Sequence, residues 1–62
     1  MNATSQLRDF RKQLEAQGFE LIVKEYLGSR RGLPDRVYYR KDERHATIVR
    51  LENGQYTMAM DA

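Results

Sequence analysis

The sequence predicts an α+β fold, in which an N-terminal helix packs on one face of a four-stranded antiparallel meander. Two patterns support this prediction: apolar residues recur with a helical period before Gly18, and they alternate with polar residues in four later segments. The chain of 62 residues is long enough for one domain, residues 1–62, with one small core. We therefore expect a two-layer sandwich, α-β-β-β-β, whose second sheet face remains open.

The first element is expected to be a helix over residues 5–17. Its apolar side chains recur at intervals of four, three and four residues, which places them on one stripe. The members of this stripe are Ala3, Leu7, Phe10 and Leu14. Gly18 ends the helix, because glycine adopts the left-handed conformation beyond a helix C-terminus without a Cβ clash.

Four strands follow, with one long loop between the first two. They are expected over residues 19–27, 36–41, 45–51 and 55–60, where apolar and polar side chains alternate or β-branched residues gather. The loop, residues 28–35, contains Pro34 and two glycines, which interrupt both strand and helix.

The two hairpin turns set the register of the sheet. Residues 53–54, Asn-Gly, predict a two-residue type I′ turn, which places Val49 opposite Met58. For the preceding hairpin we expect a three-residue loop, residues 42–44, because it places Val37 opposite Val49 and keeps both on the covered face. The expected core face of the sheet is then Phe19, Leu21, Val23, Val37, Tyr39, Val49, Leu51, Tyr56 and Met58.

The composition argues against a metal site and against catalysis. The chain has no cysteine and a single histidine, His45, so neither a disulfide nor a zinc site is expected, and no cofactor is implied. No nucleophile elbow, phosphate loop or paired-carboxylate motif is present. We expect no catalytic residues and a protein that is not an enzyme, with a nuclease as the exception left open.

A cytoplasmic location is the natural expectation for this chain. The first 17 residues contain no apolar run of signal-peptide length, and the longest aliphatic run is Leu21-Ile22-Val23. A protein without cysteine suits a reducing compartment. We expect no membrane partner.

Positive charge is concentrated in the middle of the chain. The net charge is +2, but residues 30–50 carry seven cations, six of them arginines, against three acids, which gives +4. Arginine presents a planar set of donors that suits phosphate and carboxylate groups. The alternative is a solvated surface that happens to contain arginine.

The open sheet face is a candidate site for nucleic acid or another anion. The expected register places Arg36 opposite Arg50, and two like charges across a strand pair destabilise the sheet unless a nearby acid or an external anion relieves them. Tyr38 lies between Arg36 and Arg40, and an aromatic ring beside guanidinium groups suits stacked bases and phosphates. Alternatively, Glu20 neutralises one arginine and Tyr38 shields its apolar neighbours.

The long loop adds two further arginines to this candidate site. Arg30 and Arg31 lie between two glycines, where they suit a phosphate or an acidic partner, although a solvated turn is the favoured account because one dipeptide is a very weak motif. The complete candidate set for nucleic-acid or anion binding is Arg30, Arg31, Arg36, Tyr38, Arg40 and Arg50.

The last strand is a second candidate site, for a protein. In a meander it forms a sheet edge, yet residues 55–59 contain neither a charge nor a proline, which usually protect such edges. A bare edge can pair with another strand, and a homodimer would enlarge the small core. The residues expected at this edge are Gln55, Tyr56, Thr57, Met58 and Met60.

One short stretch resembles a known family. Residues 14–19, LEAQGF, followed by a strand and then Gly28-Ser29, resemble the start of HicA-type toxins over about a quarter of the chain. The resemblance implies a double-stranded-RNA-binding-like fold in proteins that cleave RNA. However, Arg30 and Arg31 stand where that family has its catalytic histidine, and residues 55–62 predict a strand where it has a final helix. The activity is therefore not transferred to this chain.

Two functions follow from these surfaces. The first is a small non-enzymatic binding protein, of the kind carried by phages or mobile elements, that contacts nucleic acid through the Arg/Tyr face and the basic loop. The alternative is a protein-interaction module, such as an inhibitor, adaptor or assembly subunit, that acts through the uncharged C-terminal edge and forms a homodimer.

Overall fold

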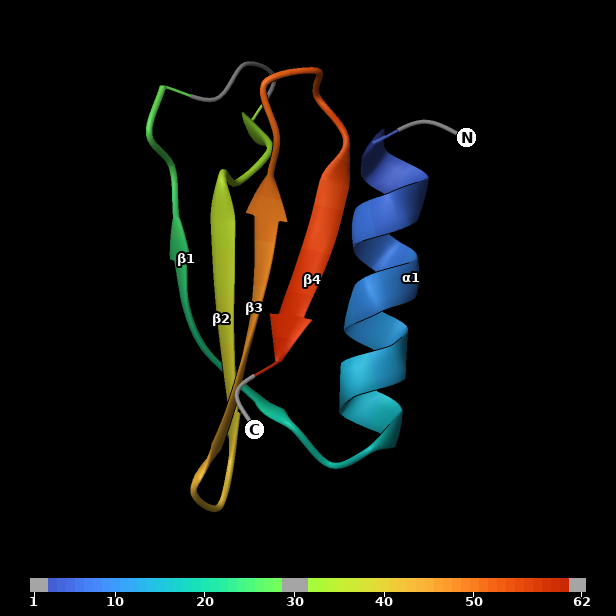
Figure 1. Ribbon diagram of the computed structural model, residues 1–62, viewed down its shortest axis with the longest axis vertical. Coiled ribbons are helices and arrows are strands. Elements are labelled where there is room, and N and C mark those ends of the chain that lie inside the picture. The colour runs from blue at the N-terminus through green and yellow to red at the C-terminus, as the bar shows by residue number, and fades with distance from the viewer. Residues whose placement is uncertain (1–2, 29–31, 61–62) are drawn as a thin grey trace.

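The computed structural model describes residues 3–28 and 32–60, and it confirms the α+β sandwich (Figure 1). One helix is followed by four strands, which form an antiparallel sheet in the order β1-β2-β3-β4. The elements are α1 (Ala3–Ala16), β1 (Glu20–Glu25), β2 (Arg36–Lys41), β3 (Arg44–Arg50) and β4 (Tyr56–Met60). Within the described ranges, no helix has the length and apolar character needed to cross a bilayer.

The end of α1 is built as the sequence predicts. Gly18 has φ 92°, and its amide donates to the Glu15 carbonyl at 3.0 Å, while the Phe19 amide donates to the Leu14 carbonyl at 3.0 Å. These two bonds form a Schellman motif, which is completed by apolar contact between the residues at its two ends. Leu14 and Phe19 are both in the core, so the helix stop also directs the chain into β1.

The helix covers one half of one sheet face. Its closest approaches are to β4 and β3, and in Figure 1 it lies alongside β4, with β1 at the opposite edge of the sheet. Leu7 and Leu14 are buried against the sheet, and Ala3 and Phe10 are partly buried beside them. The four-residue apolar stripe is therefore confirmed, but it does not reach β1.

The hairpin between β2 and β3 has a two-residue loop, not the expected three-residue one. Lys41 pairs with Arg44, and Val37 therefore lies opposite Ile48 rather than opposite Val49. Asp42 takes up the turn with φ 54°, as one central residue of a two-residue hairpin must. Aspartate tolerates this left-handed conformation better than most residues do.

The loop of the hairpin between β3 and β4 is one residue longer than the expected two-residue turn. Leu51 pairs with Gln55 through a 2.7 Å bond, and the loop holds three residues, with Gly54 at φ 86°. This is a type I turn followed by a glycine bulge, which the Asn-Gly pair fits as well as it fits a type I′ turn. Met58 therefore lies opposite Ile48.

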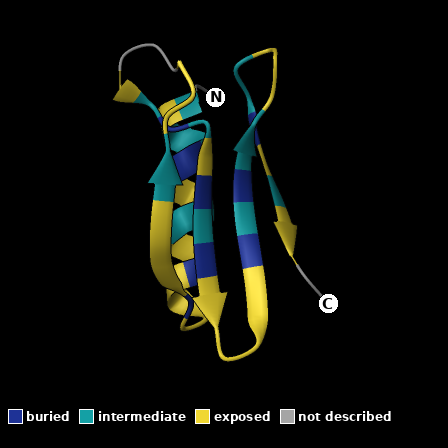
Figure 2. Cartoon of the chain, turned by 90° about the vertical axis from the view of Figure 1, so that its left-hand side faces the viewer, coloured by how far each residue is buried: buried dark blue, intermediate teal, exposed yellow. Residues whose placement is uncertain are grey.

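The loop before β3 is one residue shorter than expected and the loop after it is one residue longer, so the two changes cancel beyond β3. β2 and β4 keep their expected faces, but β3 alone is turned over, because a one-residue slip exchanges the two faces of a strand. Ala46 and Ile48 are buried where Thr47 and Val49 were expected (Figure 2). The buried core consists of Leu7, Leu14, Phe19, Val37, Tyr39, Ala46, Ile48 and Tyr56.

Strand β1 departs from the expected core as well. Its register against β2 shifts between Leu21 and Val23, which marks a bulge. Beyond it, Val23 pairs with Tyr38 and therefore shares the face away from α1. Leu21 pairs with Tyr39 on the helix side, but it is exposed because α1 does not cover β1.

The turned-over β3 predicts unequal costs for two neighbouring substitutions. We expect Ile48→Ala to destabilise the protein by about 3 kcal/mol, because it empties a fully buried position. Val49→Ala, on the half-buried open face, is expected to cost less than about 1 kcal/mol. Urea unfolding followed by circular dichroism measures both changes, and a larger loss for Val49→Ala would contradict this register.

Candidate functional site

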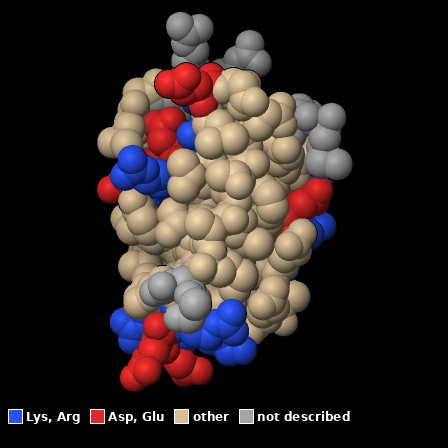
Figure 3. All heavy atoms as spheres, in the orientation of Figure 1, with Lys and Arg blue, Asp and Glu red and all other residues tan. Residues whose placement is uncertain are grey.

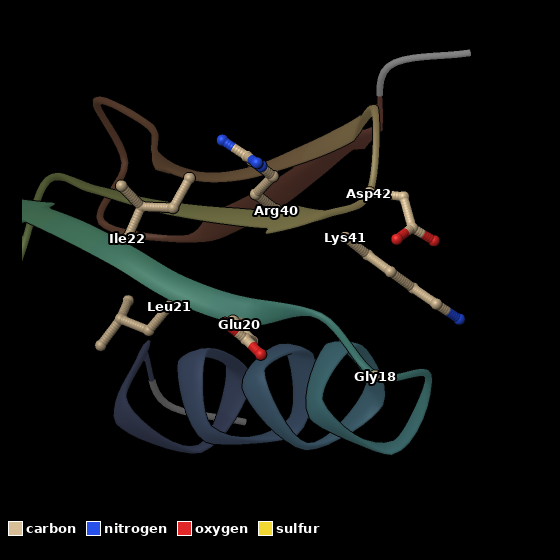
Figure 4. A pocket seen from close by; sticks show the side chains of 7 residues that line it. All are labelled: Gly18, Glu20, Leu21, Ile22, Arg40, Lys41 and Asp42. Atoms are coloured by element: carbon tan, nitrogen blue, oxygen red, sulfur yellow. The ribbon is translucent and has the colours of Figure 1, made fainter.

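The predicted Arg/Tyr face of β2 lies on the side of the sheet away from α1. Val37 and Tyr39 are fully buried on the helix side, so Arg36, Tyr38 and Arg40 alternate onto the other side. In Figure 4 the Arg40 side chain extends from β2 on the side opposite the helix. The structure thus brings three of the six predicted residues together.

Within this face, Arg36 already forms an ion pair with an acid of the same sheet. Its Nη1 lies 3.6 Å from Oε1 of Glu25 on β1, and the Tyr38 hydroxyl donates to the same oxygen at 3.1 Å. The neighbouring Tyr38 and Glu25 raise the pKa of Arg36, so it remains charged. Of the two expected partners for Arg36, a nearby acid or an external anion, the structure shows the acid, Glu25.

Arg40 differs from Arg36 in having no such partner. It is exposed, and it lies opposite Glu20 of β1 and His45 of β3. No hydrogen bond or ion pair connects its side chain to another residue in the ranges 3–28 and 32–60. Of the three residues on this face, Arg40 is the one available to an anion.

Arg50 is not part of this face, and its predicted place opposite Arg36 is wrong. Because β3 is turned over, Arg50 pairs with Tyr56 and Arg36 pairs with Val49. Arg50 Nη1 lies 3.8 Å from Oδ1 of Asp35, and its Nε is buried without a hydrogen-bond partner. The like-charge pair that motivated an anion site does not exist.

Arg50 and Asp35 instead fasten the end of the long loop. Oδ2 of Asp35 accepts a hydrogen bond from the Leu27 amide at 2.6 Å, and the Asp35 carbonyl accepts one from the Arg50 amide at 2.8 Å. The Tyr56 hydroxyl donates to the Pro34 carbonyl at 2.6 Å. Arg30 and Arg31, the other two predicted cations, lie outside the described residues.

Strand β4 is a sheet edge, as predicted, but its residues are not equally accessible. The Tyr56 ring is buried, so it belongs to the core rather than to a docking surface. Met58 is half-buried against the core, while Thr57 and Met60 are exposed. Gln55 precedes the strand and closes the turn.

The sequence reasoning missed the apolar character of the other edge. Seven large apolar side chains are exposed in the described parts of the chain, and five of them lie between residues 21 and 27. These five are Leu21 (43% exposed), Ile22 (54%), Val23 (47%), Tyr26 (53%) and Leu27 (63%). The signal was the unbroken run of three aliphatic residues, which does not fit a strand with one solvated face.

Among the surface hollows of the described residues, one borders β1 and another lies along α1. One, of 580 Å³, lies between the start of β1 and the β2–β3 turn and is lined by Gly18, Glu20, Leu21, Ile22, Arg40, Lys41 and Asp42 (Figure 4). Its cations and acids balance, and Lys41 Nζ already donates to the Gln17 carbonyl at 2.6 Å. In the same view Leu21 points toward the helix and Ile22 points away from it.

The second hollow, of 400 Å³, follows the flank of α1 that faces β2. Arg11 marks this direction, since its Nε donates to the Tyr39 hydroxyl of β2 at 3.0 Å. The Tyr39 hydroxyl in turn donates to Glu15 at 3.2 Å, and burial raises the pKa of Tyr39. The lining residues are Thr4, Leu7, Arg8, Arg11, Lys12 and Glu15, which makes this flank cationic.

Neither the arrangement of reactive side chains nor the comparisons with known proteins assign an activity. Across the described ranges, no group of three or more His, Cys, Asp or Glu side chains is placed to hold a metal ion. No protein-family model, curated protein or solved structure matches this chain. The surfaces themselves are therefore the basis for any functional argument.

The different surroundings of Arg50 and Arg36 predict different costs when each loses its acid. We expect Asp35→Ala to destabilise the fold by about 2 kcal/mol, because it leaves a half-buried guanidinium unpaired and frees the Leu27 amide. Glu25→Ala, at a pair that is 48% and 39% exposed, should cost less than about 1 kcal/mol. Chemical unfolding measures both, and equal losses would contradict a structural role for Arg50.

Proposed function

We propose that this protein is a non-enzymatic protein-interaction module, and that β1 with its continuation to Leu27 is the surface that binds the partner. The observation that carries the proposal is a set of five exposed apolar side chains on one short segment, with Leu21 on the helix side of the sheet and Val23 on the opposite side. Exposed apolar side chains concentrated in one segment, in a small protein that is 32% charged, are typical of a binding surface. The absence of cysteine fits a cytoplasmic place of action.

The bulge in β1 favours side-chain docking over simple strand addition. A bulge bends a strand and interrupts its regular row of backbone donors and acceptors, and so protects an edge from pairing. Glu20, Lys24 and Glu25 also place charges along this edge. A partner would therefore bind the apolar side chains rather than extend the sheet.

The helix flank supplies the charge that such a partner would meet. Arg8 and Lys12 line the 400 Å³ hollow, and in the described ranges neither has an ion pair. Glu15, the one acid of that hollow, is already held by Arg11 and Tyr39. We therefore propose a partner segment that is apolar and acidic, with its apolar residues on Leu21 and its carboxylates near Arg8 and Lys12.

Selection of random peptides displayed on phage tests this proposal. We expect wild-type protein to enrich peptides rich in apolar and acidic residues, and Leu21→Asp to weaken the best of them at least tenfold. Leu51→Asp is the matched control, because Leu51 is equally exposed (45%) but lies in the β3–β4 loop. Double reversal of Arg8 and Lys12 to Glu should abolish the preference for acidic peptides.

Three results would contradict the proposal: no enriched peptide, an excess of basic peptides, or equal effects of Leu21→Asp and Leu51→Asp. Chemical-shift changes in the labelled protein give an independent map. They should fall on residues 21–27 and on the helix flank around Arg8.

Nucleic-acid binding remains a second candidate, on one observation. Tyr38 and Arg40 are adjacent on the open sheet face, and Arg40 has no ion pair in the described part of the chain. A ring beside a free guanidinium suits a single-stranded base and its phosphate.

This second candidate makes a distinct prediction for three neighbouring substitutions. Binding of single-stranded DNA or RNA, followed by fluorescence anisotropy, should weaken about tenfold in Arg40→Ala and change little in Arg36→Ala. Glu25→Gln should tighten it, because Arg36 is released from its carboxylate. A lack of binding to both polymers at low salt would end the candidate.

A further inference from the structure

Strand β4 presents a regular and uncharged edge, unlike β1. The Leu51–Gln55 pair fixes the alternation of the β3–β4 ladder, so odd-numbered residues of β4 bond to β3 and even-numbered residues direct their backbone groups outward. The Tyr56 amide confirms this direction, because it donates to Oε1 of Gln6 on the helix at 3.1 Å. No register shift interrupts the pairing of β4 with β3.

The uncharged surface continues from β4 onto the helix. Gln6, Phe10 and Gln13 recur at intervals of four and three residues, so they form one stripe of α1, and the bond from Tyr56 to Gln6 shows that this stripe borders β4. Figure 3 shows a broad surface without charge over β4 and the adjoining helix, with charged side chains at its margins. On the open face, Thr57 and Ala59 extend this surface.

A surface of this composition is suited to a second copy of the same chain. In a twofold pair of strands, residues near the axis meet their own counterparts, so any charge there would oppose an identical charge. The chain contains 11 Lys and Arg and nine Asp and Glu, yet none of them occurs in β4 or on the Gln6–Phe10–Gln13 stripe. A partner of opposite charge gains nothing from such a surface.

We propose that two copies pair through β4 in antiparallel orientation, about a twofold axis perpendicular to the sheet. This pairing makes one continuous eight-stranded sheet, and it places both helices on the same face, because an axis perpendicular to the sheet does not exchange its faces. The helices also lie near each other, because α1 lies next to β4. The two uncharged helix stripes then meet, and Phe10, half-buried in one copy, is covered by the other. The Tyr56 amide stays with Gln6, so the strands join through the backbone groups of Met58 and Met60.

A dimer interface of ordinary size would take up a modest part of the surface of one copy. An ordinary specific interface buries about 800 Å² per partner, which is less than a fifth of the 4489 Å² surface of one copy. Pairing also enlarges a small core, which in the described ranges has eight buried hydrophobic residues. This inference does not rest on the proposed function, because it uses the opposite edge of the sheet.

Charge placed near the axis tests the inference. We expect the wild-type protein to sediment as a concentration-dependent dimer, and both Gln13→Glu and Gln13→Lys to weaken dimerisation at least tenfold by self-repulsion. An equimolar mixture of the two variants should restore the dimer, because opposite charges then face each other. Glu43→Gln, at an exposed position in the β2–β3 turn, is the control, and it should leave the dimer unchanged.

Hydrogen exchange gives a readout that does not depend on any substitution. The amides of Met58 and Met60 should become protected as protein concentration rises, while the amides of β1 should not. A wild-type monomer at about 1 mM, a dimer unaffected by Gln13→Glu and Gln13→Lys, or variants that fail to associate when mixed would each overturn the inference. A dimer broken by Leu21→Asp would place the interface at β1 and would also overturn it.

Discussion

Ala46 and Ile48 fill the space beneath the helix, and the orientation of β3 that puts them there determines where the arginines of the sheet lie and which acids they meet. Ile48 is fully buried between Val37 and Met58 on the neighbouring strands. With a side-chain period of two, burying Ile48 requires Thr47 and Val49 to face outward. For the same reason Arg50 lies at the end of the helix-covered face, where it forms an ion pair with Asp35.

The placement of the charged residues follows from this orientation. Arg36 has Val49 rather than Arg50 across from it, and its charge is met by Glu25 on the other side. Arg50 and Asp35 tie the start of β2 to the end of β3, next to the Tyr56 hydroxyl and the Pro34 carbonyl. Among the cations described between residues 32 and 50, Arg36 and Arg50 are thus in ion pairs, and Lys41 donates to a backbone carbonyl. Arg44 lies over the Phe19 ring, and Arg40 on the open face has no such partner.

The two edges of the sheet differ because the helix is narrower than the sheet. Four strands, at about 4.8 Å spacing, exceed the width that one helix can cover. α1 lies over β3 and β4, so β1 keeps its aliphatic side chains exposed and carries a bulge and charges instead. β4 is covered from one side, regular and uncharged, and its edge is left open to a strand of the same kind.

Much of the fold can be derived from local patterns in the sequence. The apolar stripe of α1, the stop at Gly18, the four strands and the alternation of β2 and β4 follow from spacing and from the conformational freedom of one glycine. Such features depend on residues within a few positions of one another. The candidate residues of β2 were therefore placed on the correct face.

The tertiary structure decided the orientation of β3 and the bulge in β1. Asn53-Gly54 fits a two-residue and a three-residue turn alike, and both Val49 and Ile48 are suitable core residues, so the sequence offers two registers of similar local quality. The choice between them depends on how tightly the whole set, Val37, Ile48 and Met58, packs beneath Leu7 and Leu14. The sequence by itself determined which elements form, whereas packing across the sheet decided which side chains each surface presents.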